Sequence, residues 1–211
     1  GDGQWGYHWK MANKNPDVIT NGKREIASHY YPLIGPYHSG DKEVIELAAV
    51  LHDISDHKFN GGDEQLGGDV SYDAIISLGG SAEIAEKVRI IVNSVSYKGA
   101  NVADTTTSLE AKIVQDADRL DAIGAIGIAR TFNYGGFKNR PLYNPAIPPN
   151  SKMTKEEYKN NEAPTINHFY EKLLLLKDKM NTEKGKEIAA ERHRFMETFL
   201  AQFYAEWEGL K

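Results

Sequence analysis

An apolar segment that ends in a histidine and an aspartate most constrains how this chain folds. Within residues 41–53 the apolar positions recur at helical spacing, at Val44, Ile45, Ala48 and Leu51. This spacing predicts a helix with one buried face, starting near Asp41 as its cap and closing on His52 and Asp53. Imidazole and carboxylate both ligate divalent cations, and a bound cation offsets the cost of burying a charge. The alternative is a histidine at the negative end of a helix, beside an exposed aspartate.

A second segment, residues 111–130, is predicted to form one long helix that carries more carboxylates. Its packing stripe consists of small and apolar residues, at Ile113, Ala117, Leu120 and Gly124. Asp118 and Asp121 fall beside this stripe, where a carboxylate is costly without a cation. Asp116 and Arg119 are three residues apart and are expected to pair. The alternative is a solvated acidic face, although such a face usually carries Lys and Glu rather than Ala, Ile and Gly.

The chain between these segments shows helical periodicity and little alternation of the strand type. Helices are predicted over residues 70–78 and from Ser81 onward, with Gly79 and Gly80 ending the first of them. The glycines of residues 60–68 match no phosphate-binding fingerprint and predict a flexible connector. The pattern as a whole predicts an all-α fold.

The C-terminal part combines an irregular segment with aromatic helices. Residues 132–153 are rich in Pro and Gly and predict a loop, either a lid over a pocket or a packed surface segment. Residues 164–208 predict two closing helices whose aromatic stripes are typical of a core or of a subunit interface. Such an interface leaves a homodimer as a candidate assembly.

Composition narrows the class of protein. The 211 residues are expected to form a single domain over residues 1–211 with a sizeable core. A net charge of −5 argues against a nucleic acid polymer as partner. The absence of cysteine excludes thiolate ligands and disulfides. No apolar run reaches transmembrane length and no signal-peptide pattern is present, so no membrane association and a cytoplasmic location are expected.

The two polar segments together resemble the HD-domain superfamily of metal-dependent phosphohydrolases, and within it the small bacterial YedJ-like group. The matching stretches occur in the family's order, at residues 52–59, 116–124, 128–132, 167–173 and 191–196. The resemblance implies an HD-domain helical bundle around a divalent metal ion, such as Mn²⁺, Mg²⁺ or another first-row ion. Carried over to this chain, His52 and Asp53 match the His-Asp doublet and Asp118 matches the late aspartate. Asp116 and Asp121 are then expected to orient ligands or to hold Arg119.

The first 40 residues depart from the family pattern, which places another ligand histidine well before the doublet. His29, near the end of a predicted short helix, is the candidate, ahead of His8 and His38. Either this divergent segment is rearranged, or the chain is a member of the family with altered activity.

The resemblance also implies a reaction, the hydrolysis of a phosphate ester in a nucleotide or another small phosphorylated metabolite. A divalent metal ion neutralises phosphoryl oxygens and lowers the pKa of bound water. Asp56 and Lys58 are the candidate catalytic residues, with Lys58 contacting phosphate and Asp56 relaying a proton. An exposed ion pair is the alternative for both. Two other functions stay open: a nucleotide-binding module without turnover, and a helical scaffold for a protein partner.

Overall fold

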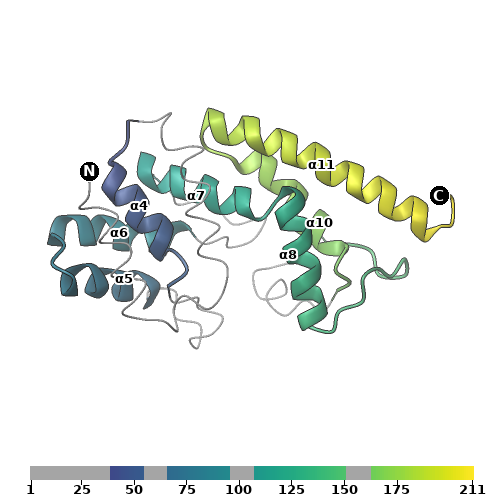
Figure 1. Ribbon diagram of the computed structural model, residues 1–211, viewed down its shortest axis with the longest axis horizontal. Coiled ribbons are helices and arrows are strands. Elements are labelled where there is room, and N and C mark those ends of the chain that lie inside the picture. Colours follow the sequence, from purple (N-terminus) through teal and green to yellow (C-terminus); the bar gives the residue numbers. More distant parts are fainter. Residues whose placement is uncertain (1–38, 55–65, 96–106, 151–162) are drawn as a thin grey trace. The chain divides into compact units, whose positions relative to one another are not determined.

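The computed structural model describes residues 39–54, 66–95, 107–150 and 163–211 (Figure 1). Every regular element in these ranges is a helix, which confirms the predicted all-α fold. None of these helices combines the length and hydropathy that crossing a membrane requires. The chain separates into two compact units, the first made of Gly1–Ser96 and Thr105–Asp118, the second of Tyr97–Asp104 and Arg119–Lys211. The single domain over residues 1–211 stays a prediction.

Unit 1 is built on helix α6 (Ala82–Val95), which packs against both α4 (Lys42–Leu51) and α5 (Leu66–Ser77). The first turns of α7 (Leu109–Asp121) also belong to this unit. Its largest fully buried side chains are aliphatic and come from α4, α5 and α7: Val44, Ile45, Ile75 and Ile113. Each such side chain contributes about 1.5–3 kcal/mol relative to an exposed position.

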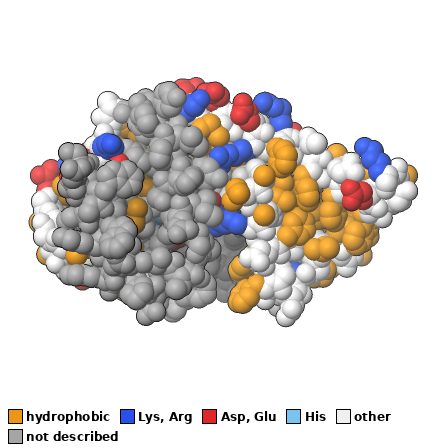
Figure 2. Space-filling view, in the orientation of Figure 1, with side chains coloured by type: hydrophobic (Ala, Val, Ile, Leu, Met, Phe, Trp, Pro, Cys, Tyr) orange, Lys and Arg blue, Asp and Glu red, His pale blue; other side chains and the backbone are white. Residues whose placement is uncertain are grey.

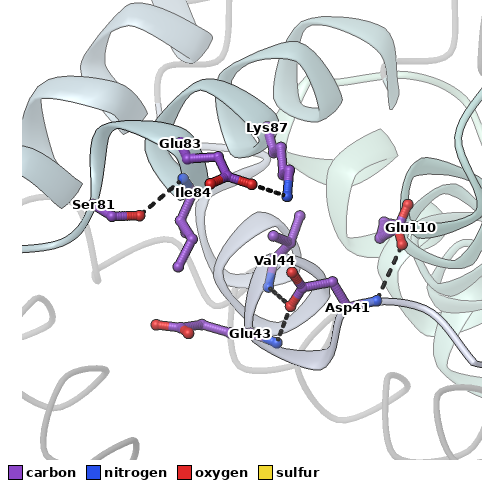
Figure 3. Close-up of polar contacts among 8 residues, drawn as sticks. All are labelled: Asp41, Glu43, Val44, Ser81, Glu83, Ile84, Lys87 and Glu110. Atoms are coloured by element: carbon purple, nitrogen blue, oxygen red, sulfur yellow. Dashed lines mark hydrogen bonds and ion pairs between the residues drawn. The ribbon is translucent and has the colours of Figure 1, made fainter.

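Two predicted helix starts are confirmed by their caps. The carboxylate of Asp41 accepts hydrogen bonds from the backbone N–H groups of Glu43 and Val44, at 3.1 and 3.4 Å (Figure 3). The hydroxyl of Ser81 accepts one from Ile84 at 3.2 Å. These bonds satisfy N–H groups that lack a partner within their own helix.

The predicted glycine connector is partly wrong, because α5 begins at Leu66 and contains Gly67 and Gly68. Both glycines are buried, and the N–H of Gly68 donates to Oδ1 of Asn93 on α6 at 3.0 Å. A Cβ atom at Gly68 would lie 2.5 Å from the Asn93 side chain. These glycines therefore permit the close approach of two helices. Gly61 and Gly62 lie outside the described residues.

The prediction of one helix over residues 111–130 is also wrong. Helix α7 ends at Asp121, and α8 (Gly124–Phe137) starts after an extended residue, Ile123. Gly124 has a φ of +77°, in the left-handed region where a side chain is strained. The break is held from outside, because Arg192 donates to the carbonyl of Leu120 at 2.5 Å. Apolar periodicity runs across the break and does not reveal it.

Unit 2 contains α8, the short helix α10 (Asn167–Glu171), a 3₁₀ helix η2 (Leu173–Lys179) and the long helix α11 (Glu183–Trp207). Helix α11 packs against α8 and η2. The first predicted closing helix is thus a short α-helix followed by a 3₁₀ helix.

An aromatic cluster joins these elements, and Figure 2 shows hydrophobic side chains gathered over unit 2. The Phe199 ring stacks on Phe169 with centroids 5.8 Å apart, and Phe132 lies edge-on to it at the same distance. Further along α11, Phe203 stacks on Trp207 at 6.0 Å. Phe199 and Phe203 of the α11 stripe therefore pack against rings of their own unit, whereas Phe195 and Trp207 are about half exposed.

The Pro- and Gly-rich segment is shorter than predicted, because α8 includes Gly135 and Gly136 and ends at Phe137. The part that follows, residues 138–150, is bound to the first and the last residue of α10. Asn167 donates from its side chain to the carbonyl of Ile147 at 2.9 Å, and Glu171 accepts from the N–H of Asn150 at 3.1 Å. These bonds favour a packed surface loop over a lid. Residues 151–153 lie outside the described residues.

Candidate metal centre

The His-Asp doublet follows directly after the last turn of α4. His52 is the C-cap residue and keeps helical backbone angles, with φ −58° and ψ −27°. Its Nδ1 atom lies 2.8 Å from the carbonyl oxygen of Ala49, a distance at which the ring donates this hydrogen bond. The bond orients the imidazole so that Nε2 points away from the helix, as histidine ligands of metal ions usually do.

Three of the four predicted ligands come together inside unit 1. The Nε2 atom of His52 lies 3.6 Å from Oδ2 of Asp53 and 3.6 Å from Oδ1 of Asp118. The imidazole is 5% exposed, whereas the two carboxylate side chains are 32% and 34% exposed. The site is therefore closed behind the ring and reachable by a small ligand on the carboxylate side.

The two carboxylates favour a positive charge at the site. Burial of the His52 ring favours its neutral form, but the Asp53 and Asp118 carboxylates outweigh burial and raise the pKa of His52 from 6.5 to about 9. Two carboxylates beside one buried imidazole thus stabilise a cation between them. The same two carboxylates would stabilise a divalent metal ion.

The donor chemistry fits such an ion. Two donors that each lie about 2.1 Å from a tetrahedral ion are roughly 3.4 Å apart, close to the two spacings at His52. No group of three or more His, Cys, Asp and Glu side chains in the described ranges meets the full geometry for holding an ion. The two spacings at His52 are therefore pairwise contacts and not a complete ligand set. The predicted fourth ligand, His29, lies outside the described residues. A mixed nitrogen and oxygen set selects weakly between divalent ions.

The remaining predicted residues have other surroundings or cannot be placed. Asp56 and Lys58 lie outside the described residues. Asp116 is fully buried in α7. Asp121 pairs with Arg130 on α8, and Arg119 donates to the backbone carbonyl of Lys179. Both arginines stabilise the surroundings of the α7–α8 break.

A contact that the sequence does not predict lies at the opposite end of the same helices. The N–H of Asp41, the cap of α4, donates to Oε1 of Glu110 at the start of α7, at 3.1 Å (Figure 3). The two residues are 69 positions apart, and no local pattern indicates their contact. The only signal was an acidic residue in the first turn of α7, which the helix dipole alone explains.

Comparisons with known proteins identify the family of this chain. A family model described as the HD domain matches residues 24–123, which include His52, Asp53 and Asp118. The chain is 37% identical to the uncharacterized protein YpgQ of Bacillus subtilis over 206 residues, 97% of this chain and 86% of that protein.

Solved structures show the same likeness. An HD-superfamily hydrolase from Bacillus thuringiensis is 36% identical, with a TM-score of 0.74 over 97% of this chain and 96% of that one. The structure of Bacillus subtilis YpgQ in complex with ADP aligns with a TM-score of 0.76 and 30% identity, over 96% of each chain.

This chain belongs to the HD-domain superfamily. Membership in this family supports the assignment of the chain to the metal-dependent phosphohydrolase kind of hydrolase. The narrower likeness to the YedJ-like group stays a prediction.

Proposed function

We propose that this protein hydrolyses phosphate esters of nucleotides with the help of a divalent metal ion. One observation carries the proposal: the buried imidazole of His52 lies 3.6 Å from the carboxylates of Asp53, just after α4, and of Asp118, on α7 of the same unit. The ADP complex of YpgQ supports a nucleotide as the substrate class. A different small phosphorylated metabolite is the alternative.

Each residue has a defined task. His52, Asp53 and Asp118 would hold the ion, and the bond from Nδ1 to Ala49 keeps the ring of His52 in its orientation. A bound divalent ion supplies charge neutralisation at phosphoryl oxygens and a lowered pKa for water. The exposed sides of Asp53 and Asp118 leave room for a phosphate to approach. By resemblance, Lys58 contacts the phosphate and Asp56 relays a proton.

The decisive experiment combines elemental analysis with hydrolysis of a panel of nucleotides and simple phosphoesters. Wild-type protein should bind a divalent metal and hydrolyse at least one nucleotide. His52→Ala and Asp118→Ala should lose both properties. Asp69→Asn, at an exposed carboxylate paired with Arg89, should keep both and serves as the control. Hydrolysis that survives the loss of metal in His52→Ala would separate the site from the activity.

The fourth ligand has its own test. His29→Ala should weaken metal binding, whereas His38→Ala and His8→Ala should not. Equal metal binding by all three variants would remove His29 from the ligand set. Metal content is measured directly, so this result does not depend on finding the substrate.

The same experiments separate the two alternative functions. A nucleotide-binding module would bind metal and nucleotide without turnover. A protein-interaction scaffold is less supported, because Phe199 and Phe203 pack against other aromatic rings of unit 2.

A further inference from the structure

Helices α4 and α7 are connected at both ends by polar contacts. At their N-terminal ends the backbone N–H of Asp41 donates to Glu110 at 3.1 Å. At their C-terminal ends His52 lies 3.6 Å from Asp118. The two helices therefore run in the same direction, and the contact at one end restricts the residues that can meet at the other.

We propose that Glu110 is a positioning residue that sets the register between α4 and α7 and thereby the spacing between His52 and Asp118. This inference rests on the proposed metal site. Glu110 is two helical turns before Asp118 on one continuous helix, so a displacement at the first residue is transmitted to the second. A slip of α7 by one residue would shift Asp118 by about 1.5 Å along the helix and rotate it by about 100°.

The contact at Glu110 has the properties that a register device needs. Its acceptor is a charged carboxylate, and hydrogen bonds to charged acceptors are about twice as strong as neutral ones. Its donor is the backbone N–H of the cap residue, and a backbone group is not displaced by side-chain rotamer changes. Asp41 in turn holds the first turn of α4 through Glu43 and Val44. The contact thus joins the backbone of one helix start to the side chain of the other.

The packing around the contact is tight. A Cβ atom at Gly40, next to Asp41, would lie 3.2 Å from Oε1 of Glu110 and 3.0 Å from Cδ1 of Ile45. Lys87 on α6 pairs with Glu83 at 2.8 Å and lies within electrostatic reach of Asp41 and Glu110 (Figure 3). All three helices therefore contribute to the place where the register is set.

The test compares Glu110→Ala, which removes the acceptor, with Glu110→Gln, which keeps a carbonyl oxygen for the Asp41 N–H. Glu43→Ala is the matched control, because Glu43 is also an acidic residue at this end of α4 and its side chain points away from the contact (Figure 3). Mn²⁺ affinity is measured by calorimetry on the full chain, well below the melting temperature of each variant.

Glu110→Ala should bind Mn²⁺ about tenfold more weakly, the lower end of the effect of residues that orient metal ligands. Glu110→Gln and Glu43→Ala should stay within about threefold of wild type, since neither loses the contact. Wild-type affinity in Glu110→Ala would overturn the proposal, even if that variant melts at a lower temperature. Equal loss in the Ala and Gln variants would also overturn it, because the effect would then follow charge rather than the hydrogen bond.

A second measurement does not depend on metal. The ¹⁵N chemical shifts of the His52 ring in metal-free protein report its contact with Asp118, and Glu110→Ala should move them while Glu110→Gln and Glu43→Ala should not. If wild type binds no Mn²⁺ but these shifts respond as expected, the proposed function fails and the positioning role of Glu110 stands. Unchanged shifts in Glu110→Ala would contradict the positioning role by itself.

Discussion

The guanidinium of Arg192 on α11 donates a hydrogen bond to the backbone carbonyl of Leu120 at 2.5 Å, next to the end of α7. The last carbonyls of a helix have no partner in the helix itself. The Arg192 side chain also lies against Gly124, where a Cβ atom would be 3.0 Å from its Cγ. Arg192 therefore stabilises the break between α7 and α8.

Replacing Arg192 with Met should lower the free energy of unfolding by about 1.5–3 kcal/mol, the usual contribution of a hydrogen bond to a charged group. Urea unfolding monitored by circular dichroism measures the change. Arg194→Met removes an exposed guanidinium from the same helix and should change stability by less than about 0.5 kcal/mol. Equal effects of the two substitutions would contradict a specific role for Arg192.

Gly68→Ala should destabilise the protein even though alanine favours a helix. The new methyl group would lie 2.5 Å from the Asn93 side chain, and overpacking costs about 1–3 kcal/mol. At Gly136, another helical glycine, the same change meets nothing within 4 Å and should raise stability by up to about 1 kcal/mol. Thermal unfolding separates the two signs. The cost of Gly68→Ala should also fall in an Asn93→Ala background, because the clashing group is then absent.

Phe199→Ala should lower the free energy of unfolding by about 1.5–3 kcal/mol, because Phe199 is half-buried and the substitution removes its apolar contacts. Phe199 contacts Phe132, Phe169 and Phe203, so its removal takes three ring contacts out of the aromatic cluster. Phe195, one turn earlier on α11, is 53% exposed, and Phe195→Ala should have little effect. A small effect at Phe199 together with a change in solution mass would instead favour an interface between subunits.

Stability should depend on Glu110 in acid. The hydrogen bond from the N–H of Asp41 is the leading cause that holds the pKa of Glu110 below its ordinary value of 4.5. A depressed folded-state pKa adds stability above the unfolded value, and this stability is lost as pH falls through the folded value. The difference in melting temperature between wild type and Glu110→Gln should therefore be largest near neutral pH and shrink below pH 4.5. A difference that does not vary with pH would show that the charge of Glu110 contributes nothing.

Much of the secondary structure was predictable because its causes are local. The caps at Asp41 and Ser81 satisfy N–H groups two or three residues away, so the helix starts could be recognised. The break after Asp121 could not, because it depends on Arg192, far along the chain. At Gly67 and Gly68 the sequence predicts a connector, because the contact with Asn93 that favours glycine comes from another helix and leaves no local pattern.

The candidate site also combines features that the sequence predicts with contacts that only the fold establishes. The His-Asp doublet and the unusual carboxylates of α7 stand out in the sequence, since charges in apolar helices require compensation. Only the folded chain showed that His52 meets Asp53 and Asp118 at 3.6 Å, while Asp121 pairs with Arg130.

By itself, the sequence determined that this protein is all-α, where several of its helices begin and which side chains are unusual for their surroundings. The tertiary structure alone decided where the long helix breaks, which carboxylates share an imidazole and how Glu110 joins α7 to α4. These features differ because the interactions behind them act over different separations along the chain. Helical hydrogen bonds and caps act over a few residues, whereas packing and charge pairing depend on distances that only the folded backbone establishes.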